Sequence, residues 1–219
     1  MRRLLHLNAS PRGRRSRSLA VAKALVDRMS AGIPGLATHR IDLFEAPLPR
    51  FDGTAVEGRY RLLHGQAPAP EEEAAWKAMR EMAQNALAHD IWLINTPMWN
   101  FGLPFPLKQW IDSVTHPGLL FEVSADGSVR GLAGGQRLIL VAASAMPFAL
   151  DPALADLDFQ LAYLNAWAGF IGITSLEAIR IAPTYGPDEV VASVMARGHA
   201  DASALAERLM QQARADAPD

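Results

Sequence analysis

A loop with large apolar side chains follows a short run of hydrophobic residues in the middle of the chain. Residues 91–94 read Ile-Trp-Leu-Ile, the pattern of a strand covered on both faces of a parallel sheet. Pro97 should end that strand, because proline cannot donate a ladder hydrogen bond. The loop beyond it, residues 98–101, reads Met-Trp-Asn-Phe, and large apolar side chains in a surface loop predict a flat apolar ligand. The alternative is that the aromatic rings only seal the loop against a neighbouring helix.

A second loop, residues 8–18, carries hydroxyl and basic side chains. Gly13 is its one glycine, so the glycine-rich fingerprint of dinucleotide-binding loops is missing. In its place stand Ser10, Ser16 and Ser18 together with Arg12, Arg14, Arg15 and Arg17. Hydroxyl groups and the free N–H groups of a helix start can hold a phosphate without glycines. The alternatives are a solvated basic loop or an Arg-rich targeting presequence.

Alternating strands and helices must position these two loops. The expected strands cover residues 4–7, 36–41, 91–94, 137–142 and about 173–181. The expected helices cover residues 19–29, 70–87, 107–114, 151–168 and 186 to near the end. This alternation predicts a doubly wound α/β fold, a five-stranded parallel sheet with helices on both faces. The flavodoxin-like order 2-1-3-4-5 fits best, and its ligand crevice lies between the first and third strands, which both loops follow.

The chain is expected to form a single flavodoxin-like domain over residues 1–219. Residues 45–70 contain four prolines and three glycines without clear periodicity, so we expect a long surface excursion there. A small hairpin is expected near 119–131, because an Asp-Gly turn at 126–127 lies between two short apolar runs.

Composition excludes several classes of protein. The net charge of −2 offers no general attraction for nucleic acid. The absence of cysteine excludes disulfides, thiolate nucleophiles and iron–sulfur clusters. No apolar run approaches the roughly 20 residues of a membrane span, and the start is too short for a secretory signal. A cytoplasmic protein with no membrane partner is therefore expected.

The remaining motifs favour cofactor chemistry. The six histidines are scattered without metal-ligand spacing, so no metal is expected, and there is no nucleophile elbow. A phosphate seat and an aromatic wall at one crevice suit a flat ligand with a phosphate tail, and FMN is the candidate. Trp99 and Phe101 would flank the edge of the ring, with Asn100 or backbone N–H groups on its pyrimidine side.

A set of motifs over nearly the whole chain carries a family resemblance. They are Ser10, Ser16-Arg17-Ser18, Pro97-Met98-Trp99-Asn100-Phe101, Leu107-Lys108 and Gly169-Phe170-Ile171-Gly172-Ile173. Together they resemble the FMN-dependent NADH azoreductases, which also act as quinone reductases. The resemblance implies a flavodoxin-like fold and a homodimer with two FMN sites at the subunit interface.

The resemblance also implies roles for individual residues. The phosphate would be held by Ser10, Ser16, Arg17 and Ser18. The isoalloxazine would be lined by Pro97, Met98, Trp99, Asn100 and Phe101, with Ser144 and Ala145 at its pyrimidine end. Phe121 and Phe170 would form the substrate pocket, with Phe170 placed over the flavin of the partner subunit. One departure is the run Ser144-Ala145-Met146-Pro147, where Pro147 removes a backbone donor that the family pattern usually keeps.

The implied activity is a two-step, ping-pong oxidoreduction. NAD(P)H passes a hydride to N5 of bound FMN and leaves, and a quinone or azo acceptor then occupies the same face. No catalytic side chain is expected, because the flavin carries the chemistry. The alternatives are a flavin-binding electron carrier without turnover, and a protein of this fold that has lost flavin binding.

Overall fold

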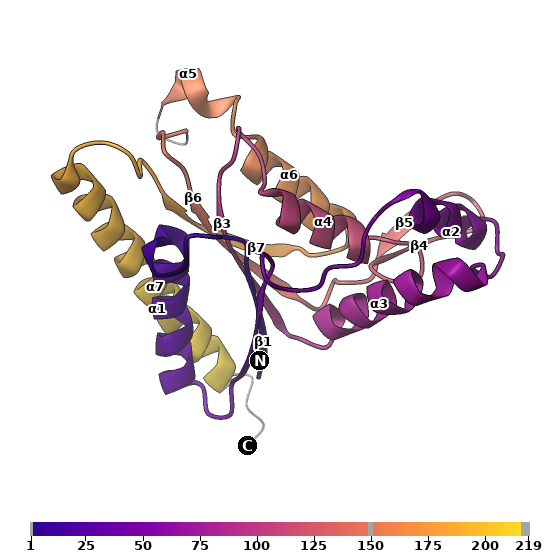
Figure 1. Cartoon of the computed structure of the whole chain (residues 1–219). Helices are drawn as coiled ribbons and strands as arrows, with labels where there is room; N and C mark the ends of the chain where they lie inside the picture. Colours follow the sequence, from indigo (N-terminus) through magenta and orange to yellow (C-terminus); the bar gives the residue numbers. More distant parts are fainter. Residues whose placement is uncertain (1, 149–150, 216–219) are drawn as a thin grey trace.

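A five-stranded parallel sheet forms the centre of the protein in the computed structural model, which describes residues 2–148 and 151–215 (Figure 1). The strands are β1 (Arg3–Asn8), β2 (Ala37–Asp42), β3 (Ile91–Pro97), β6 (Arg137–Ala143) and β7 (Ser175–Ile181). Their order is β2-β1-β3-β6-β7, and every neighbouring pair is parallel. The predicted flavodoxin-like fold is confirmed. By chain numbering the order differs from 2-1-3-4-5, because a separate hairpin supplies β4 and β5.

Helices cover both faces of this sheet (Figure 1). One face packs against α1 (Arg17–Gly32) and α7 (Asp188–Ala215), with strand residues such as Leu4, Ile91 and Leu93 in the shared core. The other face packs against α3 (Pro70–Leu87), α4 (Phe105–Val114) and α6 (Phe159–Phe170). Successive side chains of each strand point to opposite faces of the sheet, so each strand contributes to the core on both sides.

Three tryptophans fill the core on the α4 and α6 side. Trp92, Trp110 and Trp167 lie with ring centroids 6.1 Å apart in each pair. The apolar run at 91–94 is therefore buried on both faces, as its composition predicts.

Two of the predicted segments differ from the structure. The excursion at 45–70 contains a helix, α2 (Gly53–Leu63), whose first turn is capped by the Asp52 carboxylate accepting from Thr54 N at 3.1 Å and Ala55 N at 3.3 Å. The helix predicted over 151–168 is two helices, α5 (Pro152–Ala155) and α6. Asp158 breaks it, because its carboxylate caps α6 by accepting from Leu161 N at 3.0 Å.

A hairpin of β4 (Phe121–Val123) and β5 (Val129–Gly131) lies outside the main sheet, beside the C-terminal end of α6 (Figure 1). Its turn places Gly127 at a φ of 82°, which glycine adopts without strain. Among the described residues, no helix has the length and apolarity needed to cross a bilayer.

Candidate functional site

A cavity of about 210 Å³ opens at the carboxyl ends of β1 and β3. Its lining residues are Ser10, Arg12, Ser16, Arg17, Ser18, Pro97, Met98, Trp99, Ala143, Ala145 and Thr184. The structure thus brings most of the predicted cofactor residues from both loops into one cavity. Asn100, Phe101, Ser144, Phe121 and Phe170 do not line it.

One end of the cavity is formed by the start of α1. Ser16 is the N-cap residue, and its Oγ accepts from Leu19 N at 3.2 Å. The N–H groups of Arg17 and Ser18 have no protein acceptor in the described part of the chain. Free N–H groups at the positive end of a helix dipole favour an anionic ligand group at this end.

Arg17 forms a bridge at the rim of the cavity. Its guanidinium Nη1 donates a hydrogen bond to the Thr184 carbonyl, which follows β7. This bond ties the start of α1 to the last strand of the sheet. The positive charge stays beside the cavity even though the side chain is already anchored.

A tight turn, Trp99 to Gly102, lies just beyond the other end. Trp99 N donates to Gly102 O at 3.1 Å, and Gly102 N donates to Trp99 O at 2.9 Å. The two central residues have positive φ, 46° at Asn100 and 70° at Phe101. Asparagine tolerates this region, but a phenylalanine there costs on the order of 1–3 kcal/mol, and such strain gathers at functional sites.

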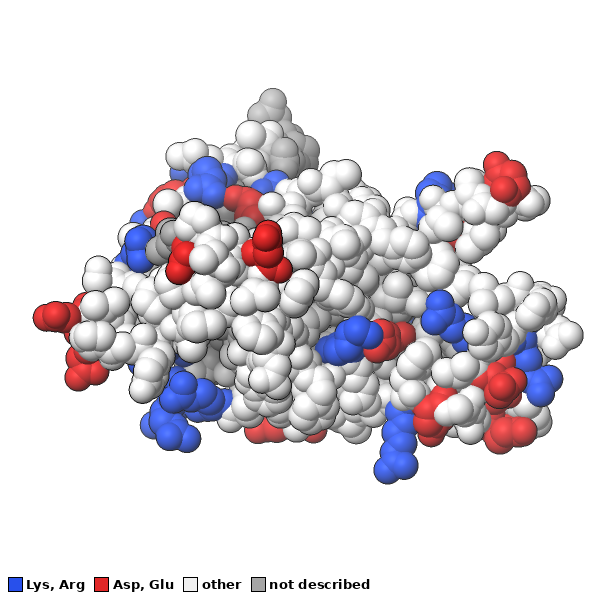
Figure 2. All heavy atoms as spheres, turned by 90° about the horizontal axis from the view of Figure 1, so that it is seen from above, with Lys and Arg blue, Asp and Glu red and all other residues white. Residues whose placement is uncertain are grey.

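Aromatic side chains lie exposed around this turn. Trp99 is 38% exposed and contacts Phe44 edge-on at a centroid distance of 5.7 Å. Phe101 is 40% exposed and contacts Phe148 at 6.0 Å. Figure 2 looks down on this end of the molecule and shows a central area with few charged side chains. The exposed rings therefore offer an apolar surface next to the cavity.

Other predicted residues take different positions. The Ser144 hydroxyl donates to Met146 O at 2.7 Å, and the Ser144 carbonyl accepts from Thr184 N at 2.9 Å, so both groups are satisfied within the surrounding loops. Phe121 and Phe170 contact each other edge-on at 4.9 Å near the β4–β5 hairpin. Figure 1 places that hairpin away from the carboxyl ends of the strands.

Phe44 and Thr184 are site residues that the sequence did not predict. Phe44 follows the end of β2 and Thr184 follows the end of β7, so both lie at the same edge of the sheet as the predicted loops. Their position after a strand end was the available signal, since ligands of open α/β sheets bind at that edge.

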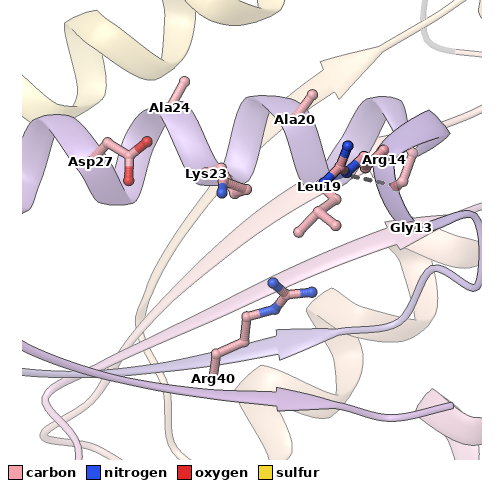
Figure 3. Close-up of a pocket in the computed structure, with 9 residues that line it drawn as sticks. Gly13, Arg14, Leu19, Ala20, Lys23, Ala24, Asp27 and Arg40 are labelled. Atoms are coloured by element: carbon pink, nitrogen blue, oxygen red, sulfur yellow. Dashed lines mark hydrogen bonds between the residues drawn. The ribbon is translucent and has the colours of Figure 1, made fainter. Parts of the chain in front are cut away.

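A larger cavity of about 560 Å³ lies between α1 and β2 (Figure 3). Charged side chains line it, namely Arg14, Lys23, Asp27 and Arg40, and of the predicted cofactor residues only Ser16 takes part. Its walls are α1, Arg40 of the edge strand β2 and the end of the loop at 8–18, and no residue of the aromatic loop at 98–101 lines it. We assign the functional site to the smaller cavity, because residues of both predicted loops line it and the strained turn lies beside it.

This fold and this cavity define a flavodoxin-like protein with an anion seat and an aromatic seat at the crevice between β1 and β3. In agreement, the family model described as "Flavodoxin-like fold" matches residues 2–205.

Named relatives narrow the class. The chain is 37% identical over 190 residues to an FMN-dependent NADH:quinone oxidoreductase from Nitratidesulfovibrio vulgaris, covering 86% of this chain and 90% of the relative. It is 35% identical over 213 residues to FMN-dependent NADH:quinone oxidoreductase 3 from Pseudomonas fluorescens, covering 95% and 98%. An FMN-dependent NADH-azoreductase from Bacillus anthracis, solved in complex with FMN, superposes with a TM-score of 0.85 at 25% identity, covering 96% and 100%. The chain belongs to the family whose members are named FMN-dependent NADH:quinone oxidoreductases, and the predicted resemblance is confirmed.

Proposed function

We propose that this protein is an FMN-dependent oxidoreductase that transfers reducing equivalents from NADH to quinones or azo compounds in two steps. The observation that carries the proposal is the single cavity that joins the free N–H groups of α1 to Trp99. The names of the relatives support the same cofactor and donor.

The residues present fit FMN. Ser10, Ser16 and Ser18, with the N–H groups at the start of α1, would hold the phosphate. The side chains of Met98 and Trp99 would contact the ring, and the backbone N–H groups of the turn at 100–101 would face its polar edge. When bound, FMN supplies the redox centre that accepts a hydride from NADH and passes it to the acceptor.

The protein's own contribution is positioning and exclusion of water. Among the described residues, the cavity lining contains two charged side chains, Arg12 and Arg17, and no carboxylate or imidazole. We therefore assign no catalytic acid or base to it, and solvent supplies the protons. By holding the hydride donor and then the acceptor beside a bound flavin, the cavity would contribute to the rate through proximity.

A homodimer with the active sites at the interface completes the proposal. Pockets that enclose small ligands usually measure about 300–1,000 Å³. The cavity of about 210 Å³ is smaller, and the rings of Trp99 and Phe101 lie partly exposed beside it. A second copy of the chain would cover these rings. Phe170 of that copy, which is 44% exposed here, would contribute to the substrate pocket together with the Phe121 that it contacts. The proposed location is the cytoplasm.

Spectroscopy and steady-state kinetics test the proposal together. We expect the purified protein to show flavin absorbance, or to gain it on addition of FMN, and to reduce menadione with NADH. Initial rates at several fixed menadione concentrations should give parallel double-reciprocal lines. A protein that gains no flavin absorbance in excess FMN would contradict the proposal, and flavin binding without turnover would instead favour an electron carrier.

A further inference from the structure

Three buried polar side chains interrupt the apolar face of the sheet that packs against α1. His6 and Asn8 come from β1, and Asn95 comes from β3 directly opposite Asn8. His6 is 2% exposed and both asparagines are 0% exposed. Buried amides are costly unless their hydrogen-bonding groups are satisfied, so the direction of each bond can be determined.

The donor and acceptor roles in this hydrogen-bond network can be assigned starting from Asp42, the last residue of β2. Its Oδ2 lies 2.6 Å from Asn8 Nδ2, and an ionised carboxylate can only accept, so the Asn8 NH₂ group must face it. The Asn8 carbonyl oxygen then faces β3, where it accepts from Asn95 Nδ2 at 2.8 Å. The orientation of the first amide therefore fixes that of the second.

Asn95 links this network to Ser18 in α1. Its NH₂ group also donates to Ser18 Oγ at 3.3 Å, while its carbonyl oxygen lies 2.7 Å from His6 Nε2. The imidazole must donate in that contact, so Nε2 carries the proton. Burial lowers the pKa of His6 to about 4 and keeps the ring neutral. An inverted Asn95 amide would place its carbonyl oxygen against the Asn8 carbonyl oxygen, so the contact with Asn8 determines its orientation.

Ser18 is the end of the network and lines the cavity. Because its oxygen accepts from Asn95, its own proton must point elsewhere. Among the described residues, the protein acceptor within hydrogen-bonding distance is Ser16 Oγ at 3.3 Å, which is beyond the usual O–H···O range, so this bond is weak even though that oxygen has a second lone pair besides the one that accepts from Leu19 N. The Ser18 proton is thus available to a stronger acceptor in the cavity.

We propose that Asp42, Asn8 and Asn95 form a positioning relay that presents the Ser18 hydroxyl as a hydrogen-bond donor to the ligand's phosphate group. This inference rests on the proposed function and adds residues of three neighbouring strands, β2, β1 and β3, that do not themselves line the cavity. The relay orients a donor and takes no part in the reaction. It acts on an anionic oxygen, so it favours a phosphorylated flavin over the same flavin without phosphate.

The test compares the dissociation constants of FMN and riboflavin, which differ only by the phosphate group. Asn95→Leu should reduce the preference for FMN over riboflavin by about tenfold, because Ser18 loses the partner that orients it. Gln160→Leu is the matched control. Gln160 is also a buried amide, 2% exposed, but it donates to Pro97 O at 2.8 Å on the aromatic side. Its replacement should leave the preference unchanged.

A double-mutant cycle isolates the relay from general damage. In a Ser18→Ala background, Asn95→Leu should no longer alter the preference, since the donor that it orients is gone. Asp42→Asn is a milder variant at the end of β2, where the new amide can donate as well as accept. It should lower the preference about threefold even if Asn95→Leu does not fold.

The outcomes separate the two claims. Equal loss of affinity for FMN and riboflavin in Asn95→Leu, or an unchanged preference in Asp42→Asn, would overturn the relay while leaving the proposed function intact. Failure of the wild-type protein to bind either flavin would overturn the proposed function.

Discussion

The two ends of the cleft are built by opposite means. At the α1 end, Ser16 and Ser18 are buried, at 4% and 1% exposure, and are held by hydrogen bonds from the same chain. At the aromatic end, Trp99 and Phe101 are more than a third exposed, and two residues of the turn lie at positive φ. At the α1 end the buried hydroxyl groups are fixed by hydrogen bonds and the helix keeps free N–H donors, whereas the other end retains strain and uncovered apolar surface.

This difference indicates how the cleft divides its tasks. A phosphate needs fixed donors, because an anion is recognised by dipoles that are oriented before it arrives. A flat ring and its exchanging substrates need an open apolar surface that a second subunit can complete. A change at one end should therefore leave the other end unchanged.

Acid is expected to have the largest effect, and it acts on the α1 end through His6. Burial lowers the pKa of His6 to about 4, from 6.5 for the free side chain. Above pH 6.5 the ring is neutral in both the folded and the unfolded chain. As the pH falls from about 6.5 to about 4, only the unfolded chain gains the proton, so the free energy of unfolding should fall by up to about 3 kcal/mol.

Urea unfolding at pH 7.5 and pH 4.5 measures this effect. His6→Gln keeps a donor for Asn95 and does not titrate, so its stability should fall less between the two pH values than that of the wild type. His116, whose pKa burial also lowers to about 4, should keep its own contribution in that variant. An identical pH dependence in the wild type and His6→Gln would contradict the assignment.

The second largest effect is expected from a carboxylate at position 18, which should weaken binding at the α1 end of the cavity and leave the aromatic end unchanged. Ser18→Asp places a negative charge in the cavity, and repulsion should weaken FMN binding about a hundredfold while riboflavin binding changes by less than threefold. Isothermal titration with each flavin measures this. Ser30→Asp, on an exposed position of the same helix, is the control and should leave both affinities unchanged. A similar loss for both flavins in Ser18→Asp would show that the substitution damages the whole cleft.

Removing the strained aromatic side chain should act on the other end. Phe101→Gly relieves the strain of the positive φ, because glycine adopts this conformation freely, but it also removes the contact with Phe148. These two effects oppose each other, so the free energy of unfolding should change by no more than about 1 kcal/mol. Phe148→Ala removes the same contact without relieving strain and should cost about 3 kcal/mol. Chemical denaturation of both variants measures the difference, and equal destabilisation would argue against strain at Phe101.

Salt should have the smallest effect. Raising the ionic strength from about 0.05 to 0.5 M should weaken FMN binding by about threefold through screening at the start of α1, and should leave riboflavin binding unchanged. Fluorescence titrations at both salt concentrations would detect this, and an equal response of the two flavins would contradict an electrostatic phosphate seat.

The sequence predicts the sheet and its two loops because strong local signals mark them. Continuous apolar runs define β1, β3 and β6, and Pro97 marks the end of β3. Helix α2 escapes prediction because its start depends on one capping carboxylate in a segment rich in proline and glycine. The break before α6 escapes prediction because Leu154, Leu157 and Leu161 continue a helical spacing that hides the local cap at Asp158. The ion pair of Asp158 with Arg180 depends on tertiary structure.

The site shows the same division. The serine and arginine residues of loop 8–18 and the aromatic residues of loop 98–101 can be predicted as site residues from their types alone. The relay is not predictable, because it depends on the register that places Asn8 opposite Asn95 and Asp42. Likewise, Thr184 reaches the cavity only because β7 ends at the same edge of the sheet.

A crystal structure of the protein grown with FMN tests the central claim most directly. We expect the phosphate within hydrogen-bonding distance of Ser16 and Ser18 and the ring against Met98 and Trp99. A flavin bound instead in the larger cavity between α1 and β2, or a cleft that stays closed by its own side chains in saturating FMN, would contradict it.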